Sequence, residues 1–251
     1  MSPTVLYPRL LSAEPALVAG FTTRAFSPSP EPLSATRDRV GESVGMRVAS
    51  AGQVHGADVA VVYEAGHVDA HDGLATDVPN LLLTVIAADC ALVLLADPES
   101  GVVGACHSGW RGTVAGVLGN TVGAMAGLGA QPDRLLAYVG PCISTEAFEV
   151  GEEVAAQFDE SVVVRRPDWP RPHVDLRAEL VRQLEALGVG PARREVAASC
   201  TVVDPALYSY RESGRAAGRM VGYIGVRGSG GKGRGGPGTV ERRPVSSDQL
   251  N

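Results

Sequence analysis

Apolar residues gather in the middle of the chain, in runs as long as buried β-strands. The three longest are LLLTVIAA at 81–88, ALVLLAD at 91–97 and GVVGACH at 101–107. Apolar and polar residues hardly alternate in these runs, which is typical of strands covered on both faces. The Asp-Pro and Ser-Gly pairs of 97–101 predict a tight turn between the last two. This pattern predicts a sheet at the centre of the fold.

The flanking segments alternate between strand and helix patterns. Further strands are expected at 18–24, in two runs within 47–64, and at 135–143, 161–166, 195–200 and 221–226. Helices are expected at 35–46, 110–128, around 147–158 and at 175–188. The last of these carries apolar residues at 176, 180, 184 and 187, which form a helical stripe. The polar segment GHVDAHDG at 66–73 predicts a turn.

No internal linker interrupts this order, so residues 1–226 are predicted to form a single α/β domain. The remaining residues, 227–251, are rich in glycine and polar side chains and show no periodicity. Such a composition cannot bury enough apolar surface to fold, and predicts a disordered tail.

Composition narrows the class of protein. Hydrophobic residues make up 45% of the chain and charged residues 20%, as in soluble globular proteins. The net charge of −6 argues against a nucleic-acid partner, which needs a basic face. No apolar run approaches the roughly 20 residues that cross a bilayer, and the first residues lack a signal-peptide pattern. A cytoplasmic protein with no membrane partner is expected.

The four cysteines, Cys90, Cys106, Cys142 and Cys200, share no CxxC spacing, which excludes a zinc ribbon. A disulfide framework is not expected in a reducing compartment. Cys106 alternates with His107 along its predicted strand, so the two side chains should point to opposite faces. Cys106 is therefore predicted to lie in the core.

Three potential ligands stand where apolar runs begin or end. They are His55 in QVHGAD, Cys90 in AADCAL and His107 in ACHSGW. Two histidines and one cysteine suit Zn²⁺ and leave a fourth position open for water, whose pKa the metal lowers. The same residues could instead serve as a cysteine nucleophile, a histidine base and an orienting histidine. Ordinary buried side chains are the third alternative.

Other residues near these ends could shape a site. Arg24 and Arg111 are candidate anion anchors, because a guanidinium offers a rigid fork of donors and Arg111 lies at a predicted helix start. Structural ion pairs are the alternative. Asp89 could orient a ligand histidine or bond to backbone. Trp110 could pack in the core or line a pocket, and YSYRESGR at 208–215 could form a pocket wall, a lid or a solvated turn.

Seven motifs, in order, resemble the laccase-domain family, whose members are described as purine nucleoside phosphorylases, polyphenol oxidases and peptidoglycan editing factors. The resemblance extends over residues 17–226. The motifs are GFTTR, QVHGAD, DG-L-T at 72–76, ADC followed by LLAD, ACHSGWRGT, GPCI with FEVGEEV, and SCT with YSYRESGRAAGRM.

The resemblance implies a single domain with mixed sheets packed between helices in αββα-like layers, related to Cys/His hydrolase-like toxins. It implies that His55, Cys90 and His107 bind zinc, or alternatively copper. The implied activity is phosphorolysis of adenosine, inosine, guanosine and methylthioadenosine to base and pentose 1-phosphate. Inorganic phosphate is then the co-substrate, and adenosine deamination is a second activity. Arg24 and Arg111 are the candidate residues for holding that phosphate. A monomer or homodimer is expected.

Three other functions stay open. A copper polyphenol oxidase normally needs HxH pairs, and the chain has five histidines and no such pair. A hydrolase of peptidoglycan precursors would use Cys90 as nucleophile and His107 as base. A non-catalytic binding protein is the third, since the segment after Arg24 is shorter than in the family. The chain also has Ala91-Leu92 where the family often has proline.

The acid that protonates the leaving base is not singled out by any motif. The candidates are His67, His71, Asp72 and Glu152.

Overall fold

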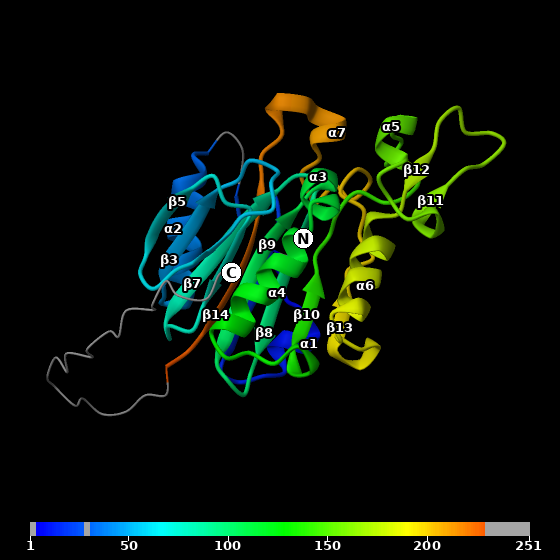
Figure 1. Ribbon diagram of the computed structural model, residues 1–251. Helices are drawn as coiled ribbons and strands as arrows, with labels where there is room; N and C mark the ends of the chain where they lie inside the picture. The colour runs from blue at the N-terminus through cyan, green and yellow to red at the C-terminus, as the bar shows by residue number, and fades with distance from the viewer. Residues whose placement is uncertain (1–3, 28–30, 229–251) are drawn as a thin grey trace, which may run out of the picture.

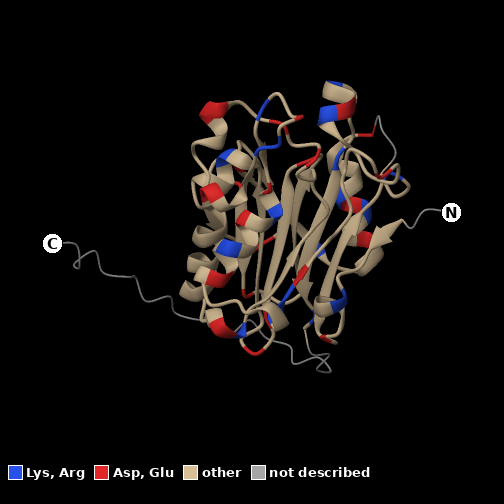
Figure 2. Cartoon of the chain, turned by 90° about the vertical axis from the view of Figure 1, so that its right-hand side faces the viewer, with Lys and Arg blue, Asp and Glu red and all other residues tan. Residues whose placement is uncertain are grey.

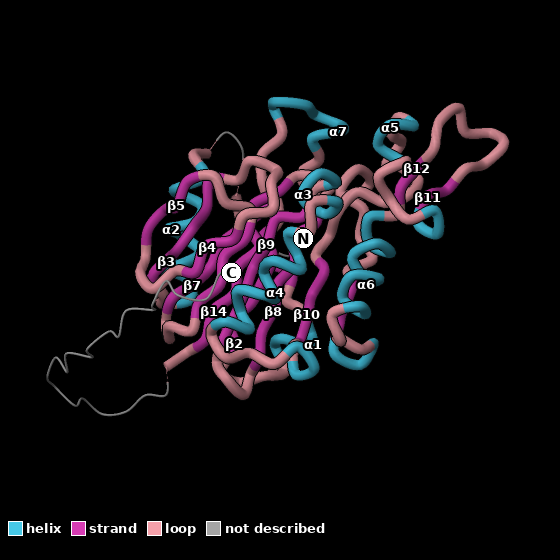
Figure 3. The backbone as a smooth tube through the Cα atoms, viewed as in Figure 1, coloured by secondary structure: helices cyan, strands magenta, loops and turns pink. Residues whose placement is uncertain are grey.

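Two six-stranded mixed sheets pack face to face in the computed structural model, which describes residues 4–27 and 31–228 (Figure 1; Figure 3). The first sheet has the order β1 (Val5–Leu6), β2 (Leu17–Thr22), β14 (Met220–Val226), β7 (Leu81–Ala87), β3 (Arg47–Gly52) and β5 (Gly66–Asp69). The second has the order β13 (Arg194–Val196), β10 (Leu136–Val139), β8 (Ala91–Asp97), β9 (Val102–Ser108), β6 (Gly73–Thr76) and β4 (Val59–Val61).

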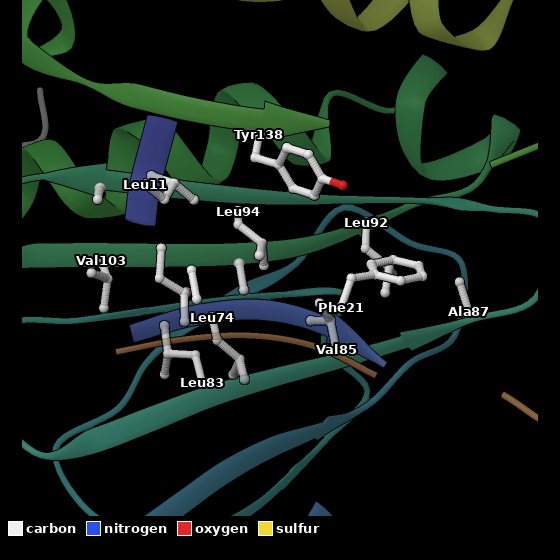
Figure 4. Close-up of a cluster of buried hydrophobic side chains, with 14 of the residues drawn as sticks. Leu11, Phe21, Leu74, Leu83, Val85, Ala87, Leu92, Leu94, Val103 and Tyr138 are labelled. Atoms are coloured by element: carbon white, nitrogen blue, oxygen red, sulfur yellow. The ribbon is translucent and has the colours of Figure 1, made fainter. Parts of the chain in front are cut away.

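The main core lies between the two sheets. Phe21 from β2 and Leu83 from β7 meet Leu92 and Leu94 from β8 there (Figure 4). The alternate β8 residues, such as Val93, face the other way and pack in a second apolar cluster. Every residue of β8 and β9 is buried, which confirms the prediction of strands covered on both faces. Figure 2 shows the long central strands almost free of charged residues.

Helices cover the outer faces of both sheets. α2 (Leu33–Val44) packs on the first sheet through Val40, and α4 (Val117–Gly127) and α6 (Leu176–Ala186) pack on the second. The predicted αββα layering is therefore confirmed. Short helices complete the fold: α1 (Arg9–Ser12), α3 (Trp110–Val114), α5 (Glu152–Ala155), α7 (Tyr210–Ser213), and 3₁₀ turns at Pro132–Arg134, Glu160–Val162, Pro191–Arg193 and Gly214–Ala216.

Several predicted elements differ in extent. The helix predicted at 110–128 is divided into α3 and α4, because Gly116 takes a left-handed conformation with φ of 86°. The segment predicted as a turn at 66–73 contains β5, which pairs in parallel with β3. The helix around 147–158 is reduced to α5, and the strand at 161–166 is reduced to β11 (Val163–Val164), which pairs with β12 (His173–Val174).

Residues 229–251 lie outside the described residues, so the disordered tail and the domain boundary at 226 stay predictions. Within 4–27 and 31–228, no helix has the length and apolar character needed to cross a bilayer.

Asp97, at the end of β8, forms an ion pair with Arg134 through a fully buried carboxylate. Its carboxylate accepts hydrogen bonds from Arg134 Nη2 at 2.7 Å and from the Gln131 N–H at 2.9 Å. Burial alone would raise the pKa of Asp97, but the bonds from Arg134 and Gln131 outweigh it and lower the pKa to about 2. Because an unfolded Asp titrates near pH ~3.9, this carboxylate stabilises the fold above that pH, and the contribution is lost as pH falls toward 2.

Asp97→Asn is therefore expected to lower the free energy of unfolding by about 2 kcal/mol at pH 7, and by much less near pH ~2.5. Urea denaturation at both pH values measures this difference. Glu99→Gln is the control, since Glu99 contacts Arg134 at 3.2 Å with an exposed carboxylate and should contribute little. An equal loss for Asp97→Asn at both pH values would contradict the assignment.

Candidate active site

The structure brings His55, Cys90 and His107 together at one end of the two-sheet sandwich. His55 lies in the loop between β3 and β4, Cys90 in the turn between β7 and β8, and His107 near the end of β9. One ligand atom from each side chain lies within 4.8 Å of the others. The antiparallel pairing of β8 with β9, which sets Leu92 opposite His107, brings the Cys90 turn beside that histidine.

Asp72 fixes two of these three residues. Its fully buried carboxylate accepts the backbone N–H groups of Val54, His55 and Gly56 at 3.0, 3.0 and 2.7 Å. It also lies 2.7 Å from Nδ1 of His107. His55 is thereby held in a left-handed conformation with φ of 63°. With Nδ1 of His107 donating to Asp72, Nε2 is the ring nitrogen that can act as a ligand.

Asp89 does not orient a ligand histidine. This corrects the first of the two roles that the sequence left open for it. Its carboxylate accepts hydrogen bonds from the Thr201 hydroxyl and from the backbone N–H of Arg211, both at 2.6 Å. Its own carbonyl accepts from the N–H of Ile143 at 2.9 Å. Asp89, next to Cys90, therefore joins three later segments of the chain to the site.

Cys90 and His107 shift each other's pKa values. Burial would raise the pKa of Cys90, but hydrogen bonds from His107 and His55 outweigh it and lower the pKa to about 6. Burial would likewise lower the pKa of His107, but Asp72 and then Cys90 raise it to about 9. A thiolate beside two imidazoles, one of them oriented by a carboxylate, is a donor set that fits Zn²⁺ or copper.

Cys106 behaves in the opposite way. It is fully buried in the cluster on the α4 side of β9, and burial raises the pKa of its thiol to about 12. The prediction that it is a core residue is confirmed.

Gly109 lies against the site with no side chain of its own. A Cβ there would stand 2.7 Å from Sγ of Cys90 and 3.3 Å from Cδ2 of His55. Its φ of −71° is available to any residue, so only the contact requires glycine. The Ser-Gly break before Trp110 thus leaves room for the two candidate ligands.

Gly109→Ala is expected to displace Cys90 or His55 and to weaken metal binding by about tenfold or more, with little loss of stability. Competition with a chromophoric chelator measures the affinity, and thermal melting measures the stability. Gly119→Ala is the matched control, because a Cβ at Gly119 meets nothing within 4 Å. Equal metal affinity in the two variants would show that this contact is unimportant.

The candidate ligands line a cavity of about 610 Å³, a size common for small-molecule sites. Its apolar wall is formed by Trp110, Ile143 and Phe148. Trp110 also packs beside the cluster that contains Ile143 and Phe148, so it has both roles that the sequence left open. Tyr210 and Arg211 line the cavity too, as expected for a pocket wall, while Tyr208 is buried and its hydroxyl donates to the carbonyl of Ser27.

The two predicted anion anchors are placed differently. Arg111 lines the cavity and stacks on Trp110 at 4.3 Å. Arg24 is not among the lining residues: its Nε donates to the carbonyl of Leu207 at 2.6 Å, and its Nη2 lies 3.5 Å from Glu212. Arg24 thus has the structural ion pair that was its alternative.

None of the four candidate acids lines the cavity; they are His67, His71, Asp72 and Glu152. Sequence reasoning missed Arg219, which does line it, and missed Asp72 as the orienting carboxylate. Both lie inside motifs quoted above, but no local pattern distinguishes them from their neighbours.

Known proteins are similar to this chain in sequence and in fold. A purine nucleoside phosphorylase of Deinococcus radiodurans is 40% identical over 216 residues, which are 83% of each chain. Adenosine deaminase RL5, from an unknown prokaryotic organism, is 36% identical over 155 residues, 59% of each chain. The crystal structure of YlmD from Geobacillus stearothermophilus superposes with a TM-score of 0.80 at 27% identity, covering 91% of this chain and 98% of that one.

The sequence profile of the family described as "Multi-copper polyphenol oxidoreductase laccase" matches residues 23–227, which include all three candidate ligands. This match confirms the resemblance to the laccase-domain family. The chain belongs to that family.

Proposed function

We propose that this protein is a zinc-dependent purine nucleoside phosphorylase that also deaminates adenosine. One observation carries the proposal: His55, Cys90 and His107 converge on a cavity that is also lined by apolar side chains and by arginines. Relatives named for a purine phosphorylase and an adenosine deaminase support an enzyme that acts on purines. The expected substrates are adenosine, inosine, guanosine and methylthioadenosine, with inorganic phosphate as co-substrate.

The cavity suits both parts of a nucleoside. Trp110 and Phe148 offer flat apolar surfaces on which a purine ring can stack, and Ile143 adds apolar area beside them. In phosphorolysis, a phosphate oxygen bonds to C1′ while the bond from C1′ to the base nitrogen breaks, and the base leaves with a proton. The residues must therefore hold an anion next to the sugar, and the arginines in the cavity wall can do so.

His55, Cys90 and His107 would hold the metal. Bound zinc supplies the Lewis acidity that hydrolytic deamination of adenine requires. Asp72 orients His107 for that role, and Gly109 leaves the space beside Cys90 open. Copper stays the alternative metal. Among the described residues this triad is the only group of three or more candidate ligands, fewer than a multicopper laccase needs.

The test is a turnover assay on protein of known metal content. Inosine should release hypoxanthine and ribose 1-phosphate only when inorganic phosphate is present, and adenosine should release ammonia as well. Buffer without phosphate is the control. Zinc-loaded, folded protein that leaves all four nucleosides unchanged would contradict the proposal.

A further inference from the structure

The cavity gathers positive charge on a chain that is acidic overall. Arg111 from α3, Arg211 from α7 and Arg219 from the segment before β14 all line it. Asp89 is the only carboxylate among the lining residues. Each of its oxygens accepts one hydrogen bond, from the Thr201 hydroxyl and the Arg211 N–H. Since the whole chain carries a net charge of −6, this local excess of cations is not a property of its general surface.

Among the residues that the structure describes, the three guanidinium groups have no acidic partner. Within residues 4–27 and 31–228, none of them is within ion-pair distance of a carboxylate. Arginines elsewhere in the fold do have such partners, as Arg134 has Asp97 and Arg182 has Glu179. Unpaired cations that share one cavity repel each other, and an anion bound between them relieves that repulsion.

Aromatic rings support each guanidinium at the cavity wall. Arg111 lies 4.3 Å from the ring centre of Trp110, Arg211 lies 5.9 Å from Phe148, and Arg219 lies 5.9 Å from Tyr210. A ring beneath the planar group restricts its motion and leaves N–H donors at its edge.

Hydrogen bonds to backbone carbonyls also fix the positions of two of the guanidinium groups. Arg211 gives one bond to the carbonyl of Glu149, and Arg219 uses Nη1 for the carbonyls of Ala217 and Gly218. Both keep further donors available.

We propose that Arg111, Arg211 and Arg219 form the subsite that binds inorganic phosphate. This inference rests on the proposed phosphorylase function, which requires phosphate beside the nucleoside. A tetrahedral dianion has enough acceptor oxygens for donors from three directions, and guanidinium forks match its geometry. Arg111 thus keeps the role expected for it, and Arg211 and Arg219 take the role that was expected for Arg24.

Direct binding tests the subsite without relying on turnover. Inorganic phosphate is titrated calorimetrically into metal-loaded wild-type protein and into Arg111→Gln, Arg211→Gln and Arg219→Gln. Each substitution should weaken phosphate binding about tenfold or more, because each removes a charge-assisted hydrogen bond. The phosphate affinity of Arg111→Lys should lie between those of the wild type and Arg111→Gln, since lysine keeps the positive charge but lacks the two-pronged guanidinium. Thermal melting confirms that each variant is folded.

Arg166→Gln is the matched control. Arg166 stacks on Trp169 at 4.3 Å, the distance that separates Arg111 from Trp110, but it does not line the cavity. Its substitution should leave phosphate affinity unchanged. A loss of phosphate binding in Arg24→Gln alone, or unchanged affinity in all three cavity variants, would overturn the subsite. A third result would also overturn the subsite. In it, wild-type protein binds inosine 5′-monophosphate but binds no inorganic phosphate, whether inosine is present or not.

The outcomes separate the subsite from the proposed function. Phosphate binding that depends on the three arginines, in protein that cleaves no nucleoside, would keep the subsite and reject the phosphorylase. Phosphate-dependent base release with an unchanged KM for phosphate in all three variants would reject the subsite and keep the phosphorylase.

Discussion

Asp72→Ala is expected to lower the free energy of unfolding by about 3–5 kcal/mol and to weaken metal binding by about 100-fold or more. The substitution removes the acceptor of three backbone N–H groups and of His107 Nδ1 from a fully buried position. Each donor left unsatisfied in the interior costs about 1–3 kcal/mol. Without this acceptor, no hydrogen bond from the N–H groups of the 54–56 loop holds His55 in its left-handed conformation. Urea denaturation and chelator competition measure the two effects.

Asp69→Ala supplies the control for this result. Asp69 lies three residues earlier, its side chain is 97% exposed, and its carboxylate lies 3.7 Å from the imidazole of His67. We expect its loss to change stability by less than about 0.5 kcal/mol and metal affinity not at all. Asp72→Asn refines the interpretation. Asparagine keeps the shape of the side chain but places an NH₂ donor where an oxygen accepted N–H groups. Its metal affinity should therefore be as low as that of Asp72→Ala. Normal metal affinity in Asp72→Ala would mean that His107 needs no orienting carboxylate.

Cys90→Ala is expected to abolish stoichiometric metal binding and to reduce base release by about 100-fold or more. The thiolate is the only sulfur among the three candidate ligands, and its removal leaves two imidazoles. Metal content after dialysis and the rate of hypoxanthine release from inosine are measured on the same preparation. The sulfur is half-buried at the cavity, so its removal should cost the fold little.

Cys106→Ala is the companion variant, because Cys106 is a fully buried thiol on the opposite face of β9. It should lower stability by about 1 kcal/mol and retain metal and activity. The informative contrary outcome is a Cys90→Ala protein that keeps its metal and loses activity. That result would assign Cys90 as a nucleophile and favour the hydrolase alternative over the phosphorylase.

The layers of the fold could be predicted from the sequence because strands buried on both faces carry apolar residues at nearly every position. β7, β8 and β9 are apolar at nearly every position, and their limits were predicted closely. The break between α3 and α4 was not predicted, because Gly116 looks like one more small residue until its φ is known. The strand β5 was missed because its residues are polar and it lies at a sheet edge.

The candidate ligands were found by motif, whereas their supporting groups depend on three-dimensional contacts. Asp89 is adjacent to Cys90 in sequence, yet Asp72, 35 residues before His107, is the carboxylate that orients that histidine. Asp89 has a φ of 84°, and its carboxylate bonds to Thr201 and to the Arg211 N–H. Arg24 and Arg219 differ only in where their segments fold, so sequence could not tell which of them lines the cavity.

The two aspartates divide the work of building the site, and this division has an evolutionary consequence. Asp72 positions His55 and His107 by hydrogen bonds, while Asp89 bonds to the segments that carry Thr201 and Arg211. Changes between residues 201 and 219 can therefore alter what the cavity accepts while the ligand geometry stays constant. Such a scaffold can diversify its substrates by drift in one segment, without first disturbing its three candidate ligands.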